Sequence, residues 1–162
     1  MKFHLKILFV PLLVGLFCGS PAARANGDHH QEQAAAIASA KEKAMVDSGQ
    51  MRGPTESSGI SANQLQGMID LAEEFPAMAG YQFRARLITV EAGGIIAIHQ
   101  HASRPAIVHI LEGEIVEHRN GEAPVSYGPG SVAFERTGYI HWWENVSDEP
   151  VIAFAVDIVQ PD

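Results

Sequence analysis

Three histidines have the spacing of a metal site. His99 and His101 are two residues apart in an apolar run that spans 95–101. Side chains of a strand alternate between its faces, so a strand here would place both imidazoles on one face. Buried imidazoles need polar partners, and a divalent metal meets that need by accepting a lone pair from each ring. A third histidine, His141, follows in the segment 138–145. The same pattern would also suit strand histidines that are held only by hydrogen bonds.

Two further residues could take part in chemistry near these histidines. Glu135 could act as a general base, or it could orient a ligand histidine from outside the metal shell. Arg104 follows the histidine pair closely and could hold a substrate carboxylate through two parallel hydrogen bonds. The alternative for Arg104 is an ordinary surface arginine in a turn.

Strands must position these residues. After residue 80, short segments rich in valine, isoleucine and aromatic residues alternate with turn signals such as Gly93-Gly94 and Asn120-Gly121. No helix-length segment separates them, which favours an antiparallel sandwich or barrel over alternating strands and helices. The expected strands are 82–91, 95–101, 106–111, 114–119, 131–135, 139–145 and 151–159.

The alternation along these strands also predicts an interior. If His141 points inward, Trp143 does so too, because the two residues are two positions apart. Phe134, Tyr139 and Phe154 are expected in the core. We expect the pocket beside the histidines to be lined by Val108, Ile110, Trp143 and Phe154.

The N-terminal part of the chain differs from the strand region. Residues 1–25 have a basic start, a short apolar run and a small-residue cleavage site, Ala23-Arg24-Ala25, which predicts a secretory signal peptide. Residues 26–79 are expected to form a helical extension and linker. Helix is predicted over 28–48 and again from Ser61, where Ser61 and Gln64 fit a capping box. Residues 80–162 would then form the main domain.

Composition excludes several classes of function. The chain has 162 residues and a net charge of -8, which disfavours binding to nucleic acid and to anionic membrane surfaces. Its single cysteine, Cys18, lies in the predicted signal peptide, so the mature chain would lack thiol chemistry and disulfides. We therefore expect no nucleic-acid partner and no membrane partner after signal cleavage.

Two motifs carry a resemblance to a known family. The segment 94–101, with both histidines, is followed by Ile110-Leu-Glu-Gly-Glu114, and together they resemble the first motif of the cupins. The segment 130–145 resembles the second cupin motif, including Gly138, His141 and Asn145. The resemblance implies an all-β, double-stranded β-helix (jelly roll) with its site inside the barrel, here with an N-terminal helical extension. It also implies a homodimer.

The resemblance places His99, His101 and His141 at ligand positions. The family's glutamate position falls on Ala106, or on Pro105 if the turn is one residue shorter, and neither side chain can bind a metal. Three imidazoles with open positions suit Fe(II), which we favour, or Zn(II), Cu(II) or Ni(II). Mn(II) prefers oxygen ligands and is disfavoured without the glutamate. A degenerate site without metal is the alternative.

These observations lead to one favoured function and two alternatives. We expect an exported, periplasmic or secreted cupin that binds a divalent transition metal through three histidines and acts on a small molecule as a dioxygenase-type enzyme. The first alternative is a non-catalytic module that binds a small metabolite or sugar without essential metal. The second is a metal-free isomerase in which a barrel histidine is the base.

Overall fold

The computed structural model describes residues 38–160. The predicted signal peptide, 1–25, and residues 28–37 of the predicted helix over 28–48 lie outside the described residues. Within 38–160, no helix is long and apolar enough to cross a membrane.

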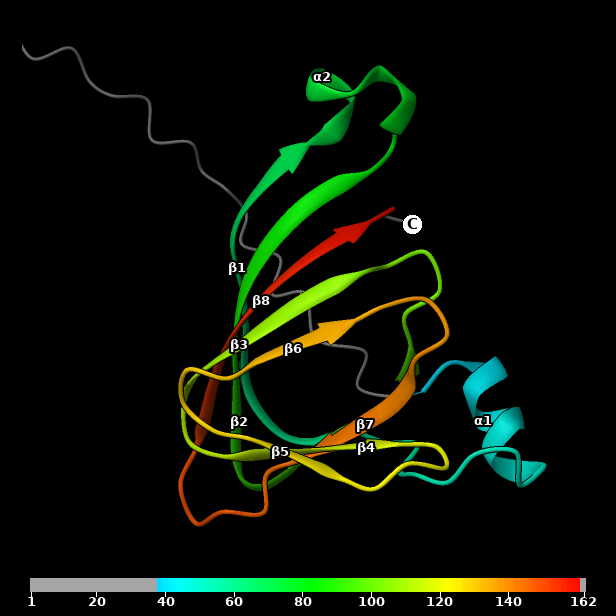
Figure 1. Cartoon of the computed structure of the whole chain (residues 1–162), viewed down its shortest axis with the longest axis vertical. Coiled ribbons are helices and arrows are strands. Elements are labelled where there is room, and N and C mark those ends of the chain that lie inside the picture. Colours follow the sequence, from blue (N-terminus) through cyan, green and yellow to red (C-terminus); the bar gives the residue numbers. More distant parts are fainter. Residues whose placement is uncertain (1–37, 161–162) are drawn as a thin grey trace, which may run out of the picture.

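The described chain is mainly β-strand (Figure 1). It begins with helix α1 (Ala40–Asp47), strand β1 (Ser58–Asp70), the short helix α2 (Leu71–Glu74) and the 3₁₀ turn η1 (Pro76–Met78). Strands then follow one another to the end of the described chain. They are β2 (Gln82–Gln100), β3 (Ala106–Glu112), β4 (Ile115–Arg119), β5 (Val125–Tyr127), β6 (Val132–Glu135), β7 (Ile140–Glu144) and β8 (Val151–Val159).

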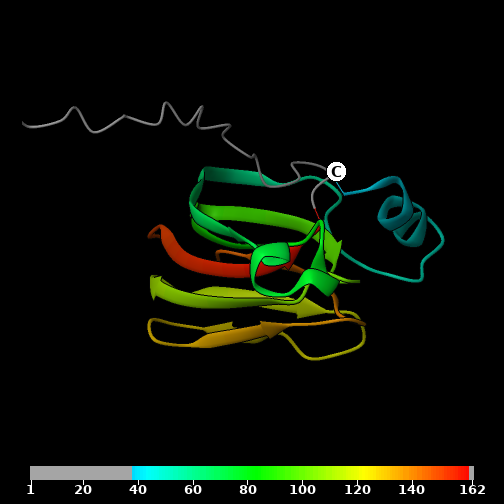
Figure 2. The same cartoon turned by 90° about the horizontal axis from the view of Figure 1, so that it is seen from above.

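These strands form one antiparallel, nearly closed barrel. The order in the sheet is β5-β4-β7-β2-β8-β3-β6, and β1 pairs with β2 outside this path. The first half of β2 pairs with β8, and its second half pairs with β7. This strand therefore belongs to both walls of the barrel, one that contains β8, β3 and β6 and one that contains β7, β4 and β5. Figure 2 shows β1, β2, β8, β3 and β6 one below the other, in their order in the sheet. The predicted all-β, double-stranded β-helix is confirmed.

The bend of β2 between the two walls depends on a glycine pair. Gly93 has a φ of 69°, in the left-handed region that favours glycine. A Cβ on Gly94 would lie 2.7 Å from Val90 Cγ1 and 2.8 Å from the carbonyl oxygen of Glu91. The sequence predicted two strands, 82–91 and 95–101, interrupted at this pair. The structure joins them into one continuous, sharply bent strand.

Inward-facing side chains change from charged to apolar along the barrel. Asp157 on β8 is level with Arg84 on β2 and with Ala106 on β3. Four residues further toward the start of β8, Ala153 is level with Ile88 and Ile110. The buried core continues from there, with Val90, Ile115, Ala133, Trp143, Val151 and Ala155. One end of the barrel is therefore polar and the other is apolar.

The helix predicted from Ser61 is wrong. Residues 58–70 form β1, which pairs with β2 from Ser58↔Ile95 to Asp70↔Gln82. The apolar stripe that suggested a helix is not buried, because Leu65, Met68 and Ile69 are exposed. Backbone pairing with β2 overrides the local helix signal. Although β1 precedes the predicted domain boundary at residue 80, it is part of this sheet.

The described helix α1 lies against the end of β2. Ser39 caps it, and Ser39 and Glu42 form a capping box. The carboxylate of Glu42 also accepts a hydrogen bond from the backbone N–H of Gln100, at 2.9 Å. Ala38, Met51 and Ile98 form a small buried cluster beneath this contact. The N-terminal segment is thereby fixed next to the two histidines of β2.

Candidate metal centre

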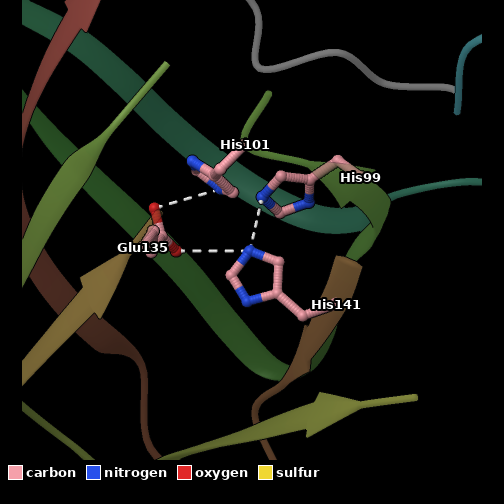
Figure 3. A group of neighbouring side chains, drawn as sticks. All are labelled: His99, His101, Glu135 and His141. Atoms are coloured by element: carbon pink, nitrogen blue, oxygen red, sulfur yellow. Dashed lines mark hydrogen bonds and ion pairs between the residues drawn. The ribbon is translucent and has the colours of Figure 1, made fainter. Parts of the chain in front are cut away.

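Four side chains converge at the polar end of the barrel (Figure 3). His99 and His101 come from the end of β2 and the residue after it, His141 comes from β7, and Glu135 is the last residue of β6. Their ligand atoms all lie within 4.8 Å of one another. His99 and His141 face each other directly across the β2–β7 pair. The predicted grouping of the three histidines is present in the structure, with a carboxylate added.

The closest contacts in this cluster are between the Nε2 atoms of the histidines and the carboxylate of Glu135. His141 Nε2 lies 3.1 Å from His99 Nε2 and 3.5 Å from Glu135 Oε1. His101 Nε2 lies 3.3 Å from Glu135 Oε2. All three Nε2 atoms thus point toward one small volume that the carboxylate also reaches.

Hydrogen bonds at the opposite ring nitrogens identify the tautomer of each histidine. His99 Nδ1 lies 2.9 Å from the carbonyl oxygen of Ala97, and His101 Nδ1 lies 2.9 Å from that of Arg104. His141 Nδ1 lies 2.5 Å from Glu117 Oε1. Carbonyl and carboxylate oxygens only accept, so each Nδ1 carries the proton and donates it. A neutral ring in this tautomer leaves the Nε2 lone pair free.

Burial keeps two of these rings neutral. It lowers the pKa of His101 to about 3, although a hydrogen bond to the Arg104 carbonyl acts in the opposite direction. Burial, followed by the charges of His141 and His101, lowers the pKa of His99 well below its usual value. The His101–Glu135 contact is therefore no ordinary ion pair at neutral pH, because the ring is uncharged.

The donor set fits a divalent cation. Without a proton or a cation between them, the Nε2 lone pairs and the carboxylate oxygens would repel one another. His101 Nε2 is buried and has no hydrogen-bond partner among the described residues. Burial also raises the pKa of Glu135, although the charges of His141 and Arg104 and a hydrogen bond from Trp143 act in the opposite direction. A cation at the centre would satisfy all four groups, and three nitrogens with one oxygen suit Fe(II), Mn(II), Zn(II), Cu(II) or Ni(II).

A buried carboxylate supports His141 from behind. Glu117 on β4 is 1% exposed and accepts the Nδ1 proton of His141. Arg119 donates two hydrogen bonds to Glu117, both 2.8 Å, and the Tyr127 hydroxyl donates a third at 3.1 Å. Although burial would raise the pKa of Glu117, the hydrogen bonds from His141 and Arg119 lower it to about 2. Glu117 is thus ionised and fixes both the tautomer and the orientation of His141.

Sequence reasoning missed Glu135 as the fourth member of this cluster. The carboxylate position of the first motif falls on Ala106, and the prediction therefore left the site without a carboxylate. In the structure, Ala106 on β3 is the direct cross-strand partner of Glu135 on β6. The carboxylate thus reaches the same place from the neighbouring strand. Strand alternation could have predicted that Ala133 and Glu135 point to the same face, because they are two positions apart. To place Glu135 in the cluster, one would also need to know that it pairs with Ala106 across β3 and β6, and no local pattern contains that register.

The other predicted site residues divide into two groups. Val108, Ile110 and Trp143 line the cavity beside the cluster, as predicted, and Arg104 lines its polar end. Phe154 does not line it, because its neighbours Ala153 and Ala155 take the inward positions of β8. The core assignment of Phe134 is also wrong, since this side chain is 61% exposed on the outer side of β6.

Comparison with protein families now identifies the barrel. Residues 86–157 match a family model described as "Cupin domain". This segment is a cupin domain. It contains all four members of the cluster together with Glu117 and Arg104. A comparison with curated protein sequences finds no significant match.

Solved structures with a similar chain include several cupins. A predicted oxalate decarboxylase from Thermotoga maritima is 25% identical, with a TM-score of 0.46, covering 69% of this chain and 96% of that one. A cupin 2 conserved barrel domain protein from Salinispora arenicola is 18% identical, with a TM-score of 0.47 and coverages of 68% and 82%. The Cnp3 cupin domain from Schizosaccharomyces pombe is 19% identical, with a TM-score of 0.44. The match covers 46% of this chain and only 51% of that one.

Proposed function

We propose that this cupin is a metalloprotein that binds one divalent transition ion through His99, His101, His141 and Glu135. The observation that carries the proposal is the convergence of three imidazole Nε2 atoms and one carboxylate within 4.8 Å. Four protein donors leave positions open on an octahedral ion for a substrate or for dioxygen. Glu135 supplies the oxygen ligand whose expected absence argued against Mn(II), so Mn(II) joins Fe(II) as a favoured ion.

We further propose that the protein acts on a small molecule, as a dioxygenase-type enzyme if the ion is Fe(II). The ion would supply Lewis acidity and, for a redox-active metal, activation of dioxygen. The protein's own residues hold the reacting centre in place. Glu117 keeps the proton of His141 on Nδ1, and the apolar wall that includes Trp143 and Ile110 excludes water from the interior.

The first test is elemental analysis of the full chain, expressed with its N-terminal segment and purified without chelators or an affinity tag. We expect close to one equivalent of a transition metal, and its loss in the His99→Ala/His101→Ala double variant. No metal in the wild-type protein, together with no uptake of added Fe(II), Mn(II) or Zn(II), would contradict the proposal.

Chelation distinguishes the enzyme from the first alternative, a binding module without essential metal. Turnover by an enzyme of the proposed kind should stop after chelation and return when the ion is added back. A binding module would keep its affinity for its ligand in the chelated state.

Export and self-association are separate proposals. We propose that residues 1–25 direct export and are then removed, which mass spectrometry of the exported protein would show as a chain that begins at Asn26. We also propose a homodimer, since Phe83, Ile107 and Phe134 expose apolar surface on the outside of the sheet. Sedimentation of Phe134→Glu beside the wild type tests this, and a monomeric wild type would contradict it.

A further inference from the structure

The cavity of the barrel has two chemically different ends. Its wall at the apolar end consists of aliphatic side chains, those of Ile88, Val90, Ile96, Ile110, Ile115 and Val151. Trp143 lies between this wall and the cluster, with its ring centroid 5.6 Å from that of His141. At the other end the cavity is bounded by Glu42, His99, His101, Arg104 and Glu135, with Arg86 beside them. A molecule that fills this cavity must therefore be apolar along its body and polar at one end.

The size of the cavity limits the body of that molecule. The internal space is about 130 Å³. An apolar cavity of about 150 Å³ in another protein holds benzene. The cavity thus suits one aromatic ring or a branched aliphatic group of similar volume. It does not suit a sugar, because the aliphatic side chains of its wall offer no hydrogen-bond partner and the indole N–H of Trp143 is already bonded to Glu135.

Arg104 determines what kind of polar end fits. Its backbone carbonyl accepts the Nδ1 proton of His101, so its position relative to the metal cluster is fixed. Its guanidinium lies 3.7 Å from Asp157 Oδ2, farther than the 2.9 Å contact between that oxygen and Arg84. Arg104 is thus only loosely paired with Asp157, and its side chain is 30% exposed.

The charges at this end favour an anion. A divalent ion held by Glu135 keeps one net positive charge. Three arginines at this end, Arg84, Arg86 and Arg104, outnumber the two further acids, Asp157 and Glu42, so the end as a whole stays positive. A carboxylate could contact both the ion and Arg104, because one oxygen can bind the ion while the other accepts a hydrogen bond from an arginine. A neutral group of the same shape would leave this positive charge uncompensated.

We propose that the ligand of this site is a small monocarboxylate with an apolar body, whose carboxylate lies between the metal and Arg104 and whose body fills the aliphatic end of the cavity. This inference rests on the proposed metal site and names the substrate class for it. It also makes Arg104 the residue that selects for the carboxylate.

Three probe molecules test the proposal on the full chain loaded with Zn(II), which has no redox chemistry. Benzoate has both features, acetate lacks the apolar body, and benzamide lacks the charge. We expect benzoate to bind about tenfold or more tightly than acetate, because the ring leaves water. We expect a similar preference over benzamide, because a hydrogen bond to a charged group is stronger than one to a neutral group.

Variants separate the role of Arg104 from general effects. Arg104→Gln should weaken benzoate binding by about tenfold or more while leaving benzamide binding nearly unchanged. Arg136→Gln is the matched control, since Arg136 is exposed and contacts Tyr139. If Arg104→Gln does not fold, Arg104→Lys replaces it, and an intermediate loss is expected because a lysine keeps the charge without the planar fork.

The outcomes distinguish the ligand proposal from the metal proposal. Equal affinities for benzoate and acetate, or for benzoate and benzamide, would overturn the ligand class, as would an Arg104→Gln variant with wild-type benzoate affinity. If the wild type takes up no Zn(II), the proposed metal site fails. Benzoate is then titrated into the metal-free protein. Binding that depends on Arg104 would uphold the ligand class, and absence of binding would overturn it.

Discussion

At the scale of single residues, the cluster contains a carboxylate at a different position from the one that the first cupin motif predicts. Ala106 stands where the first cupin motif carries its carboxylate, and sequence reasoning correctly found no ligand there. The cross-strand position holds Glu135 instead, so a carboxylate still reaches the cluster. A motif compared position by position cannot reveal this exchange, because it depends on which residues pair across β3 and β6.

An exchange of the two side chains tests that interpretation. Glu135→Ala should lower metal affinity strongly, because it removes the only carboxylate in the four-residue cluster. Adding Ala106→Glu to it should restore part of the affinity, since the new carboxylate enters the space that Glu135 leaves. Metal titration of the wild type and both variants measures this. Glu144→Ala is the control, as Glu144 pairs with His118 instead. Wild-type affinity in Glu135→Ala would refute the ligand role.

The second prediction at this scale concerns Glu117. Glu117→Gln should lower metal affinity about 10–100-fold, the usual effect of losing a partner that orients a ligand histidine. Glu122→Gln is the matched control, because Glu122 also contacts Arg119, at 3.6 Å, but is exposed. Metal titration, with a thermal melt of each variant, measures the effect. Equal affinities for both variants and the wild type would show that Glu117 has no such role.

At the scale of elements, the sequence predicted what depends on local pattern. The strands β3, β4, β6, β7 and β8 lie where alternation and turn residues placed them. The segment from Ser61 was misassigned because its capping signal and its apolar spacing are both local. Its pairing with β2 depends on residues some twenty positions away, which no local pattern contains. Strand β5 was missed because it is only three residues long.

One residue shows how loops keep these elements in position. Asn145, fully buried at the end of β7, reaches three carbonyls with Nδ2: those of Val90 and Glu91, each at 3.0 Å, and that of Glu149 at 2.8 Å. Its Oδ1 accepts hydrogen bonds from the backbone N–H and hydroxyl of Ser147. The side chain thus joins the bend of β2 to the loop before β8.

Asn145→Ala should therefore destabilise the whole barrel. We expect a loss of about 3 kcal/mol in the free energy of unfolding, because several buried polar groups lose their partner. Asn120→Ala is the matched control, with a loss of about 1 kcal/mol, since Asn120 is exposed and donates one hydrogen bond to Gln50. Urea unfolding compares the two. Similar losses in both variants would contradict the role given to Asn145.

At the scale of the whole molecule, charged contacts between neighbouring strands stabilise the polar end of the barrel. Arg84 donates two hydrogen bonds to Asp157, at 3.1 and 2.9 Å, and Arg86 donates a third at 3.2 Å. These contacts connect β2 with β8, and Asp157 is 1% exposed. Burial alone would raise the pKa of Asp157, but the hydrogen bond from Arg84 and the charges of Arg86 and Arg84 lower it below its usual value.

This lowered pKa determines how stability depends on pH. A carboxyl whose pKa is lower in the folded state binds its proton more tightly when unfolded, so acid favours unfolding. The stabilisation from Asp157 should be complete above the usual aspartate pKa, about 3.9. It should be lost as the pH falls below that value and through the lower pKa of the folded state.

Asp157→Asn isolates this contribution. At pH 7 the variant should be less stable than the wild type by about 3 kcal/mol, since breaking a buried charged pair typically costs that much. The difference should shrink as urea unfolding is repeated at lower pH, because the protonated aspartic acid comes to resemble the asparagine. Asp148→Asn, in an exposed loop position, should differ little from the wild type at any pH. The difference in the free energy of unfolding between Asp157→Asn and the wild type could instead stay constant well below the usual aspartate pKa. That result would show that Asp157 contributes through its shape and not through its charge.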